Sequence, residues 1–402
     1  MAVSEETLKS LLEGNESAKA LARKYPQKRQ AFGSVFRGGR AFTGIAGLRG
    51  IGKTTLLLQR LLEEPDAFYI SLDQFTDLNL FEAAKTLRER YGSKELLLDE
   101  ISYLKNWPQQ LKQVYDRLET RVRFTSSVAI DIINAKADLS RRIIVWHLYP
   151  FSFNEYLRFA KGISAPKIAI SDLDNATKMQ EIAKLDPYFE GYLAGGLVPA
   201  YLEDKDPAIF KGILERILER DLVFALGFSG EDVLNVKAML EHIANSGIDD
   251  VSYSSIARNA GITKYKAIKY VEALENAFVL NAVKPAGSNV MKEPKILFTP
   301  PFRAVYQKNR DAGQILGAAR EEFFVLAMRS NGMEVNYLKG VRGEKKPDYV
   351  AVIDGKKHVF EIGGRQKSRA QMKKHGGAHA YILTYPSNTI HSYRPLTAIG
   401  ML

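Results

Sequence analysis

A chain of 402 residues with a formal net charge of +11 and no cysteine is long enough for more than one hydrophobic core. The missing cysteine excludes disulfides and thiolate metal sites and fits a reducing, cytoplasmic interior. No apolar run approaches about 18 residues and the first residues lack a secretory pattern, so we expect neither a membrane partner nor secretion. The surplus of Lys and Arg is common in proteins that bind nucleic acid.

The N-terminal segment begins with an amphipathic helical pattern over residues 5–25 and continues into a basic stretch that ends at residue 40. One interpretation is an arm that binds nucleic acid. The other is a solvated helix packed beside the core of the first domain. Charge runs are usually solvated faces, which favours the second interpretation.

Residues 41–55 predict a phosphate-binding loop, because Gly47 to Thr54 follows the spacing G-x-x-x-x-G-K-[ST]. Glycines let backbone N–H groups turn toward a phosphate, Lys53 would reach the β and γ phosphates, and the Thr54 hydroxyl would ligate Mg²⁺. A predicted strand before the loop and a predicted helix after it provide the required context. The predicted nucleotide-contacting residues are Gly47, Leu48, Arg49, Gly50, Ile51, Gly52, Lys53, Thr54 and Thr55.

A second nucleotide-binding pattern follows a predicted strand over 67–73 and a predicted helix over 78–91. It is a run of three leucines that ends in Asp99 and Glu100. We expect Asp99 to hold Mg²⁺ together with Thr54, and Glu100 to orient and deprotonate the attacking water.

Further strands are predicted over 121–127 and 141–150. Helical patterns occur before the first of them and after the second. Strands that alternate with helices predict an α/β fold with a parallel sheet covered on both faces. The phosphate-binding loop then lies at the carboxyl end of a strand, where ligands of such sheets bind.

These motifs together resemble the prokaryotic, especially archaeal, AAA+ ATPase family. The resemblance is carried by segments 47–55, 97–107, 115–117, 125–127, 148–156 and 195–199, together with residue 142. It implies a P-loop ATPase that binds ATP and ADP with Mg²⁺, followed by a helical lid, a winged helix and a nuclease-like C-terminal domain.

By the same resemblance, Lys53 and Glu100 are catalytic, the Thr125 hydroxyl senses the γ phosphate, and Arg142 resembles an arginine finger. The sequence departs from the family pattern at Ser126 and at Arg141, where glycine is usual. The second departure leaves open whether Arg141 or Arg142 acts on the γ phosphate.

The segment 230–302 predicts a winged helix-turn-helix, from three helical patterns followed by two short strands. Three lysines on the early turns of the third helix, Lys264, Lys266 and Lys269, suit the phosphates of double-stranded DNA. Winged helices also serve as protein-interaction modules, and this interpretation stays open.

The last block resembles the PD-(D/E)xK nuclease fold, with Glu322, Asp348 and Glu361 as its metal-binding acids. Gly363 stands where such nucleases need a lysine, so we expect a degenerate site that does not cut DNA. Arg365 and Lys367 belong to a basic run that could still hold a phosphate backbone.

The sequence therefore predicts an ATPase core over 1–157, a helical lid over 158–229, a winged helix over 230–302 and a nuclease-like domain over 303–402. The predicted function is Mg²⁺-dependent ATP hydrolysis coupled to DNA binding. Two alternatives are an ATP-regulated DNA endonuclease and a nucleotide-switched signalling or defence module that gates a protein partner. Both a homo-oligomer and a protein partner are compatible with the sequence.

Overall fold

The computed structural model of the chain describes residues 3–37, 39–127, 139, 141–287, 293–308, 312–338, 346–364, 379–388 and 393–402. Its contacts divide the chain into two compact units, Met1–Tyr149 and Pro150–Leu402. Each unit is described by itself.

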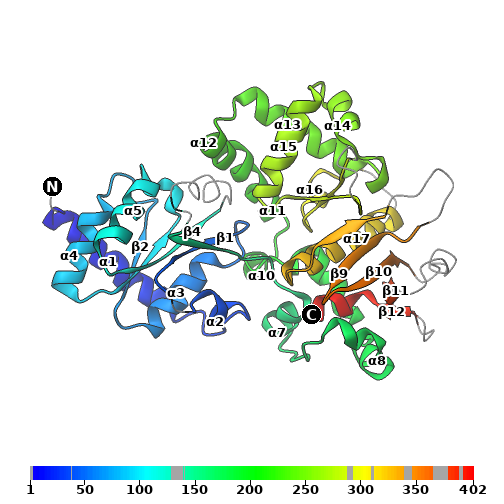
Figure 1. Cartoon of the computed structure of the whole chain (residues 1–402), viewed down its shortest axis with the longest axis horizontal. Helices are drawn as coiled ribbons and strands as arrows, with labels where there is room; N and C mark the ends of the chain where they lie inside the picture. The colour runs from blue at the N-terminus through cyan, green and yellow to red at the C-terminus, as the bar shows by residue number, and fades with distance from the viewer. Residues whose placement is uncertain are drawn as a thin grey trace. The chain divides into compact units, whose positions relative to one another are not determined.

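The first unit is built on a five-stranded parallel sheet with strand order β2-β3-β4-β1-β5 (Figure 1). Strands β1 and β3 are buried along their whole length, as expected for parallel strands with helices on both faces. In Figure 1, α5 lies above this sheet and α3 below it, so the predicted α/β layering is confirmed. The elements are β1 (Phe42–Ala46), α3 (Lys53–Glu63), β2 (Ala67–Ser71), α4 (Leu80–Tyr91), β3 (Glu95–Asp99), α5 (Trp107–Arg117), β4 (Arg121–Ser126) and β5 (Ile143–His147).

The N-terminal helix α1 (Glu5–Ala22) covers the free edge of the sheet. Its buried Asn15 accepts a hydrogen bond from the backbone N–H of Tyr69 in the edge strand β2, at 2.9 Å. Pairing an edge N–H with a side chain protects the strand from pairing with another chain. In the basic stretch that follows, Arg29 donates to the carbonyls of Ile51 (3.2 Å) and Tyr149 (2.8 Å). These contacts fit the interpretation of a helix and arm packed beside the core.

The second unit begins with short helices whose aromatic side chains pack against the C-terminal part of the same unit. The ring of Phe189 lies 4.7 Å from that of Phe323 and 4.7 Å from that of Tyr385. Asp186 accepts hydrogen bonds from the backbone of Ser387 and the hydroxyl of Thr397. The helices are α7 (Phe153–Lys161), α8 (Ala176–Ala183), α9 (Phe189–Gly191), α10 (Tyr201–Asp204), α11 (Ala208–Arg216) and α12 (Leu222–Leu226).

Three helices and a two-stranded antiparallel hairpin follow, at the positions and in the order that the sequence pattern predicts. They are α13 (Gly230–Asn245), α14 (Tyr253–Ala260), α15 (Lys264–Asn276), β6 (Leu280–Val283) and β7 (Lys295–Phe298).

The C-terminal part forms a mixed sheet of five strands in the order β12-β11-β10-β9-β8. The strands β8, β9 and β10 pair antiparallel, whereas β10, β11 and β12 pair parallel. Helix α17 contacts the central strand β10 of this sheet. The elements are α16 (Arg303–Tyr306), α17 (Ala312–Ser330), β8 (Val335–Tyr337), β9 (Tyr349–Ile353), β10 (Lys356–Gly363), β11 (His379–Thr384) and β12 (Tyr393–Pro395).

The hairpin and the C-terminal sheet share contacts across the predicted domain boundary at residue 302. Arg329 of α17 donates to Glu275 (2.9 Å) and to the carbonyl of Ala282 (2.7 Å). The backbone of Tyr337 in β8 bonds to that of Lys284 and Ala286 just after β6. These bonds explain why this part of the chain is one compact unit. None of the helices in the described ranges combines the length and apolar character needed to span a bilayer.

Candidate functional site

The loop between β1 and α3 has the backbone that the glycine spacing predicts. Gly50 and Gly52 adopt positive φ angles of 77° and 90°, a conformation that side chains disfavour. At Gly47 the constraint is space, because a Cβ there would lie 2.4 Å from the carbonyl oxygen of Leu148. The loop therefore delivers the N-terminus of α3, a favourable position for an anion, directly after the strand.

Lys53 begins α3 and is buried. Its ammonium donates to the carbonyl oxygens of Gly47 (2.7 Å) and Leu48 (2.9 Å), so the lysine lies over the loop that it follows. This brings a cation to the middle of the candidate phosphate site.

Asp99, at the end of β3, lies at the centre of a buried network of hydroxyl groups. Its Oδ2 accepts from the hydroxyl of Thr54 at 2.7 Å and from that of Tyr69 at 3.0 Å. Its Oδ1 accepts from the hydroxyl of Thr125 on the neighbouring strand β4. Burial, reinforced by the Asp99 charge, raises the pKa of Tyr69, which keeps its hydroxyl a donor. Three elements thus orient one carboxylate, and the two predicted nucleotide motifs meet at it.

Glu100 follows in a left-handed conformation, with φ 53°. Its backbone N–H donates to Thr125 Oγ1 at 2.8 Å. Its Oε1 lies 3.4 Å from Nη1 of Arg49 in the loop, and its Oε2 accepts from Ser127 at 3.4 Å. The structure therefore brings Glu100, Asp99, Thr54, Lys53 and Thr125 together at the carboxyl edge of the sheet.

Arg142 does not join this group within its own chain, and whether Arg141 or Arg142 acts on a γ phosphate stays a prediction. Phe42 pairs with Ile143, so Arg142 lies at the amino edge of the parallel sheet, whereas the loop leaves the carboxyl edge. Five strand residues at about 3.3 Å each separate the two edges. Arg142 forms a two-pronged ion pair with Asp116 (2.9 and 3.2 Å) and lies over the ring of Tyr115.

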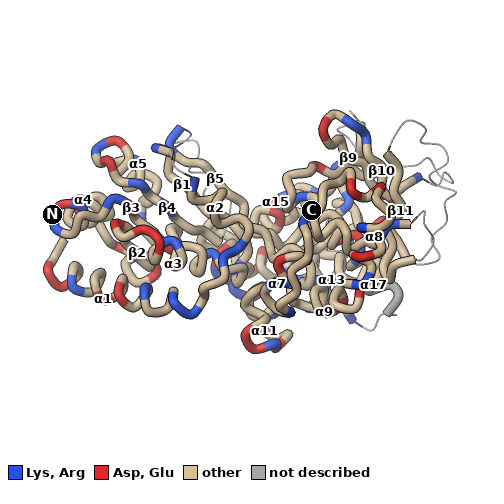
Figure 2. The backbone as a smooth tube through the Cα atoms, turned by 90° about the horizontal axis from the view of Figure 1, so that it is seen from below, with Lys and Arg blue, Asp and Glu red and all other residues tan. Residues whose placement is uncertain are grey.

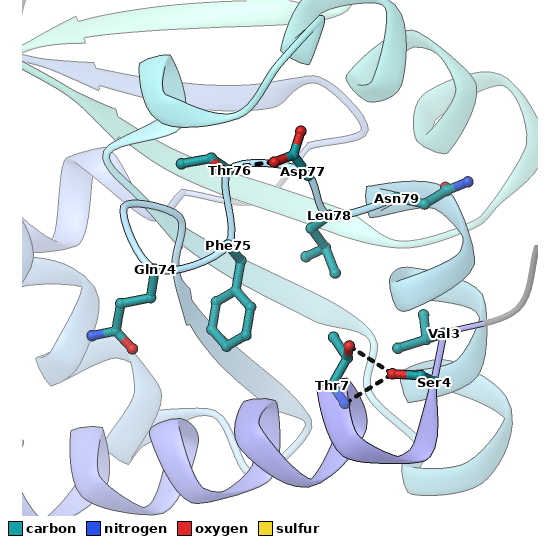
Figure 3. Close-up of a pocket in the computed structure, with 9 residues that line it drawn as sticks. All are labelled: Val3, Ser4, Thr7, Gln74, Phe75, Thr76, Asp77, Leu78 and Asn79. Carbon is teal, nitrogen blue, oxygen red and sulfur yellow. Dashed lines mark hydrogen bonds between the residues drawn. The ribbon is translucent and has the colours of Figure 1, made fainter.

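A pocket of about 380 Å³ lies elsewhere on the first unit (Figure 3). It is formed by the start of α1 and the segment between β2 and α4, where Ser4 caps the helix through Thr7. Because β2 is three strands away from β1 in the sheet, this pocket is distinct from the phosphate-binding loop.

The predicted acid set of the C-terminal domain also needs a correction, because Glu322 is paired with Arg303 and not grouped with Asp348. Glu322 is buried and accepts from Nε of Arg303 at 2.6 Å and from the backbone of Phe298 at 3.0 Å. The preceding residue, Glu321, interacts with Asp348 instead, and burial raises its pKa. Within the described parts of the chain, no three acidic or histidine side chains form a group that could hold a metal.

An unexpected cation lies beside these acids. Lys295 of β7, whose side chain is 11% exposed, lies 3.6 Å from Glu321 and 2.8 Å from Asp249. Burial lowers its pKa, but Glu321, Asp249 and Asp348 outweigh this effect and the pKa of Lys295 is raised. The acids Asp348 and Glu361 lie one residue beyond the paired Tyr349 and Phe360, so the antiparallel register sets them side by side.

The three lysines predicted to contact DNA all lie on α15, and each is paired with an acid of the same chain. Lys264 pairs with Glu293, Lys266 with Asp232 at 3.5 Å, and Lys269 with Glu272 at 3.3 Å. Figure 2 shows basic and acidic segments interspersed along both units. Arg365 and Lys367 lie outside the described residues.

Sequence reasoning missed Tyr69, Glu321 and Lys295 as site residues. Tyr69 stands two positions before the end of β2, on the face that also carries the Asp99 side chain, but this is visible only once the strands are aligned. Glu321 and Lys295 stand 26 positions apart in the chain (321 − 295), on different elements, and no local spacing connects them.

Two family models match parts of the chain. Residues 40–157 match the model described as AAA domain. Residues 186–308 match a domain of unknown function, DUF8612. The chain is 31% identical over 365 residues to the uncharacterized protein MJ1637 of Methanocaldococcus jannaschii, covering 82% of this chain and 76% of that protein. It belongs to the same family as that protein.

Solved structures with partial likeness include the RuvB Holliday junction branch migration motor of Thermotoga maritima. It shares 18% identity over 70% of this chain and 90% of its own, with a TM-score of 0.28. The Hsp104–ADP complex of S. cerevisiae shares 15% identity over 65% of this chain and 39% of its own, with a TM-score of 0.27.

Proposed function

We propose that this protein is a Mg²⁺-dependent ATPase whose nucleotide site is formed by residues 47–55 together with Asp99 and Glu100. The observation that carries the proposal is the 2.7 Å hydrogen bond from Thr54 to Asp99, residues 45 positions apart. Thr54 belongs to a loop whose glycine spacing suits phosphates, and Asp99 is one of two carboxylates that follow a run of leucines. Their contact is more specific than either pattern alone.

The donor set at this contact fits Mg²⁺. Thr54 Oγ1 and the Asp99 carboxylate are hard oxygen ligands, which Mg²⁺ prefers, and they lie beside the start of α3. When bound, Mg²⁺ neutralises phosphate charge. Lys53, already buried over the loop, provides a second positive charge for the terminal phosphates.

In the proposed reaction, Glu100 accepts a proton from a water molecule whose oxygen forms a bond to the terminal phosphorus. The bond between that phosphorus and the bridging oxygen breaks, and ADP leaves. Thr125 fixes the backbone of Glu100 and the carboxylate of Asp99 at once, so it positions both carboxylates.

Two substitutions test these roles. Lys53→Ala should abolish nucleotide binding, because the site loses its principal cation. Glu100→Gln should bind ATP but not turn it over, because it keeps the shape of the side chain and removes the base. Lys112→Ala, an exposed lysine on α5, is the matched control for loss of one charge. ATP hydrolysis by Glu100→Gln at the wild-type rate would contradict the role proposed for Glu100.

We further propose that residues 230–302 are a winged helix that binds double-stranded DNA through backbone phosphates. The order of the three helices and the hairpin supports this proposal. Affinity should be largely independent of sequence, and replacing Lys264, Lys266 and Lys269 should lower the salt slope by about 0.9 for each phosphate that is no longer neutralised. An unchanged salt slope would show that DNA does not bind through these lysines of α15.

A second candidate function is favoured by the ion pairs of these same lysines. Because each is already paired with an acid, α15 suits a module in which the nucleotide state gates a protein partner. ATPase turnover with and without duplex DNA separates the two functions. Stimulation by DNA supports the first, and identical turnover supports the second.

The C-terminal domain, in our proposal, does not cut DNA. Gly363 stands at the lysine position, and Lys295 already neutralises part of the acid cluster. Supercoiled plasmid incubated with the protein, ATP and Mg²⁺ or Mn²⁺ should stay intact. Nicking that is lost in Asp348→Ala and in Lys295→Ala, but kept in Glu100→Gln, would show an active endonuclease whose lysine comes from β7, and repeating it without ATP would show whether ATP regulates it.

A further inference from the structure

Arg49 is a cation within the phosphate-binding loop whose side chain turns toward the proposed base. Its guanidinium Nη1 lies 3.4 Å from Glu100 Oε1, and the two side chains are only 13% and 20% exposed. The pair joins the loop after β1 to the end of β3, so it spans the strand β4 that separates them in the sheet.

Glu100 is held at several points besides this ion pair. Its left-handed backbone is fixed by the N–H bond to Thr125, and its second carboxylate oxygen accepts from Ser127 at 3.4 Å. Both oxygens are therefore engaged by this chain's own donors. A general base needs one oxygen directed at the water from which it takes a proton.

The position of Arg49 offers a way to release that oxygen. It stands four residues before Lys53, in the loop that would surround the phosphates. A guanidinium binds phosphate oxygens through two parallel hydrogen bonds, and a triphosphate offers more negative charge than a single carboxylate.

We propose that Arg49 is a positioning residue whose guanidinium leaves Glu100 and binds the terminal phosphate of the bound nucleotide. The carboxylate of Glu100 is then available to act as the base. This inference rests on the proposed ATPase function. According to this proposal, ATP releases Glu100 and ADP does not. Only ATP carries the terminal phosphate that the water attacks.

A comparison of the two contacts of Arg49, with Glu100 and with a phosphate, favours the exchange. The contact of Arg49 with Glu100 is a single hydrogen bond of 3.4 Å, whereas a guanidinium binds a phosphate through two charge-assisted hydrogen bonds of about 2.7–2.9 Å. The contact with Glu100 is thus strong enough to hold the base and weak enough to yield to a phosphate.

A binding cycle tests this exchange. Wild type, Arg49→Met, Glu100→Gln and the double variant are titrated, with Mg²⁺, against ADP and the non-hydrolysable β,γ-imido analogue of ATP. Glu100→Gln weakens the contact of Arg49 with residue 100 and should tighten binding of the analogue by about two- to fivefold. In the Arg49→Met background that tightening should disappear. Arg49→Met alone should weaken binding of the analogue about tenfold and that of ADP much less.

Lys112→Ala controls for the loss of one positive charge, thermal melting controls for folding, and Arg49→Lys should restore part of the affinity for the analogue. Equal effects of Glu100→Gln in both backgrounds would overturn the exchange, even if ATP is bound and hydrolysed through Glu100. Failure of wild type to bind either nucleotide would instead overturn the proposed ATPase, and the inference with it.

Discussion

Single residues of the phosphate-binding loop are constrained by different physical causes. Gly50 and Gly52 are needed for their positive φ angles, whereas Gly47 is needed for close approach. A Cβ on Gly47 would also lie 2.6 Å from Cδ1 of Ile51, but the backbone carbonyl of Leu148 is the neighbour that cannot rotate away. The close approach of Gly47 to Leu148 ties the loop to the segment after β5.

Gly47→Ala should therefore displace the loop and lower ATP affinity by about fivefold or more, because overpacking of this kind costs about 1–3 kcal/mol. Titration with a fluorescent ATP derivative measures the change. Gly33→Ala in α2 (Phe32–Val35) is the matched control, since no atom lies within 4 Å of a Cβ added there. Equal affinities in both variants would contradict the steric role of Gly47.

At the scale of elements, helix α13 begins with a reciprocal capping box. The hydroxyl of Ser229 accepts from the backbone of Asp232 at 3.2 Å, and the Asp232 carboxylate accepts from the backbone of Ser229 at 2.9 Å. Tyr270 of α15 donates to the same carboxylate. The Tyr270 hydroxyl, followed by the Ser229 donors, lowers the pKa of Asp232 well below its usual value.

This shift predicts a pH dependence with a definite sign. A carboxyl with a lowered folded-state pKa adds stability that is complete above its unfolded pKa of about 4 and is lost as the pH falls below it. Asp232→Asn keeps the acceptor oxygen and removes the charge. We expect it to be less stable than wild type by about 1 kcal/mol at pH 7, with a difference that narrows progressively as the pH falls from 4 to 2, measured by urea unfolding. A difference as large at pH 2 as at pH 7 would contradict this origin.

At the scale of the whole molecule, the second unit is joined by a buried ion pair between Arg303 and Glu322. Their side chains are 5% and 2% exposed. Arg303 also donates to the carbonyls of Ile243 and Ala244 at the end of α13, each at 3.0 Å. One arginine thus links α13 to α17, which belong to different predicted domains.

Arg303→Met should destabilise the unit by about 3–5 kcal/mol, because it leaves Glu322 buried and unpaired. The double variant Arg303→Met/Glu322→Leu should recover part of this loss. Lys211→Met, which breaks an exposed pair with Glu215, should cost less than about 1 kcal/mol. Thermal unfolding followed by circular dichroism measures all three, and separate transitions for residues 230–302 and the C-terminal sheet would argue against a single unit.

The sequence by itself determined the loop at Gly47–Thr54, the acids Asp99 and Glu100, and the parallel α/β sheet, because each follows from local spacing and hydrophobic pattern. Only the tertiary structure decided that Glu321, not Glu322, interacts with Asp348. Consecutive helix residues point about 100° apart, and packing selects the one that faces the sheet. The tertiary structure also decided at which edge of the sheet Arg142 lies, because this follows from the strand register. It likewise decided the pairing of Arg49 with Glu100 and of Lys295 with Glu321. These are contacts between elements distant in the chain, and no local pattern encodes them.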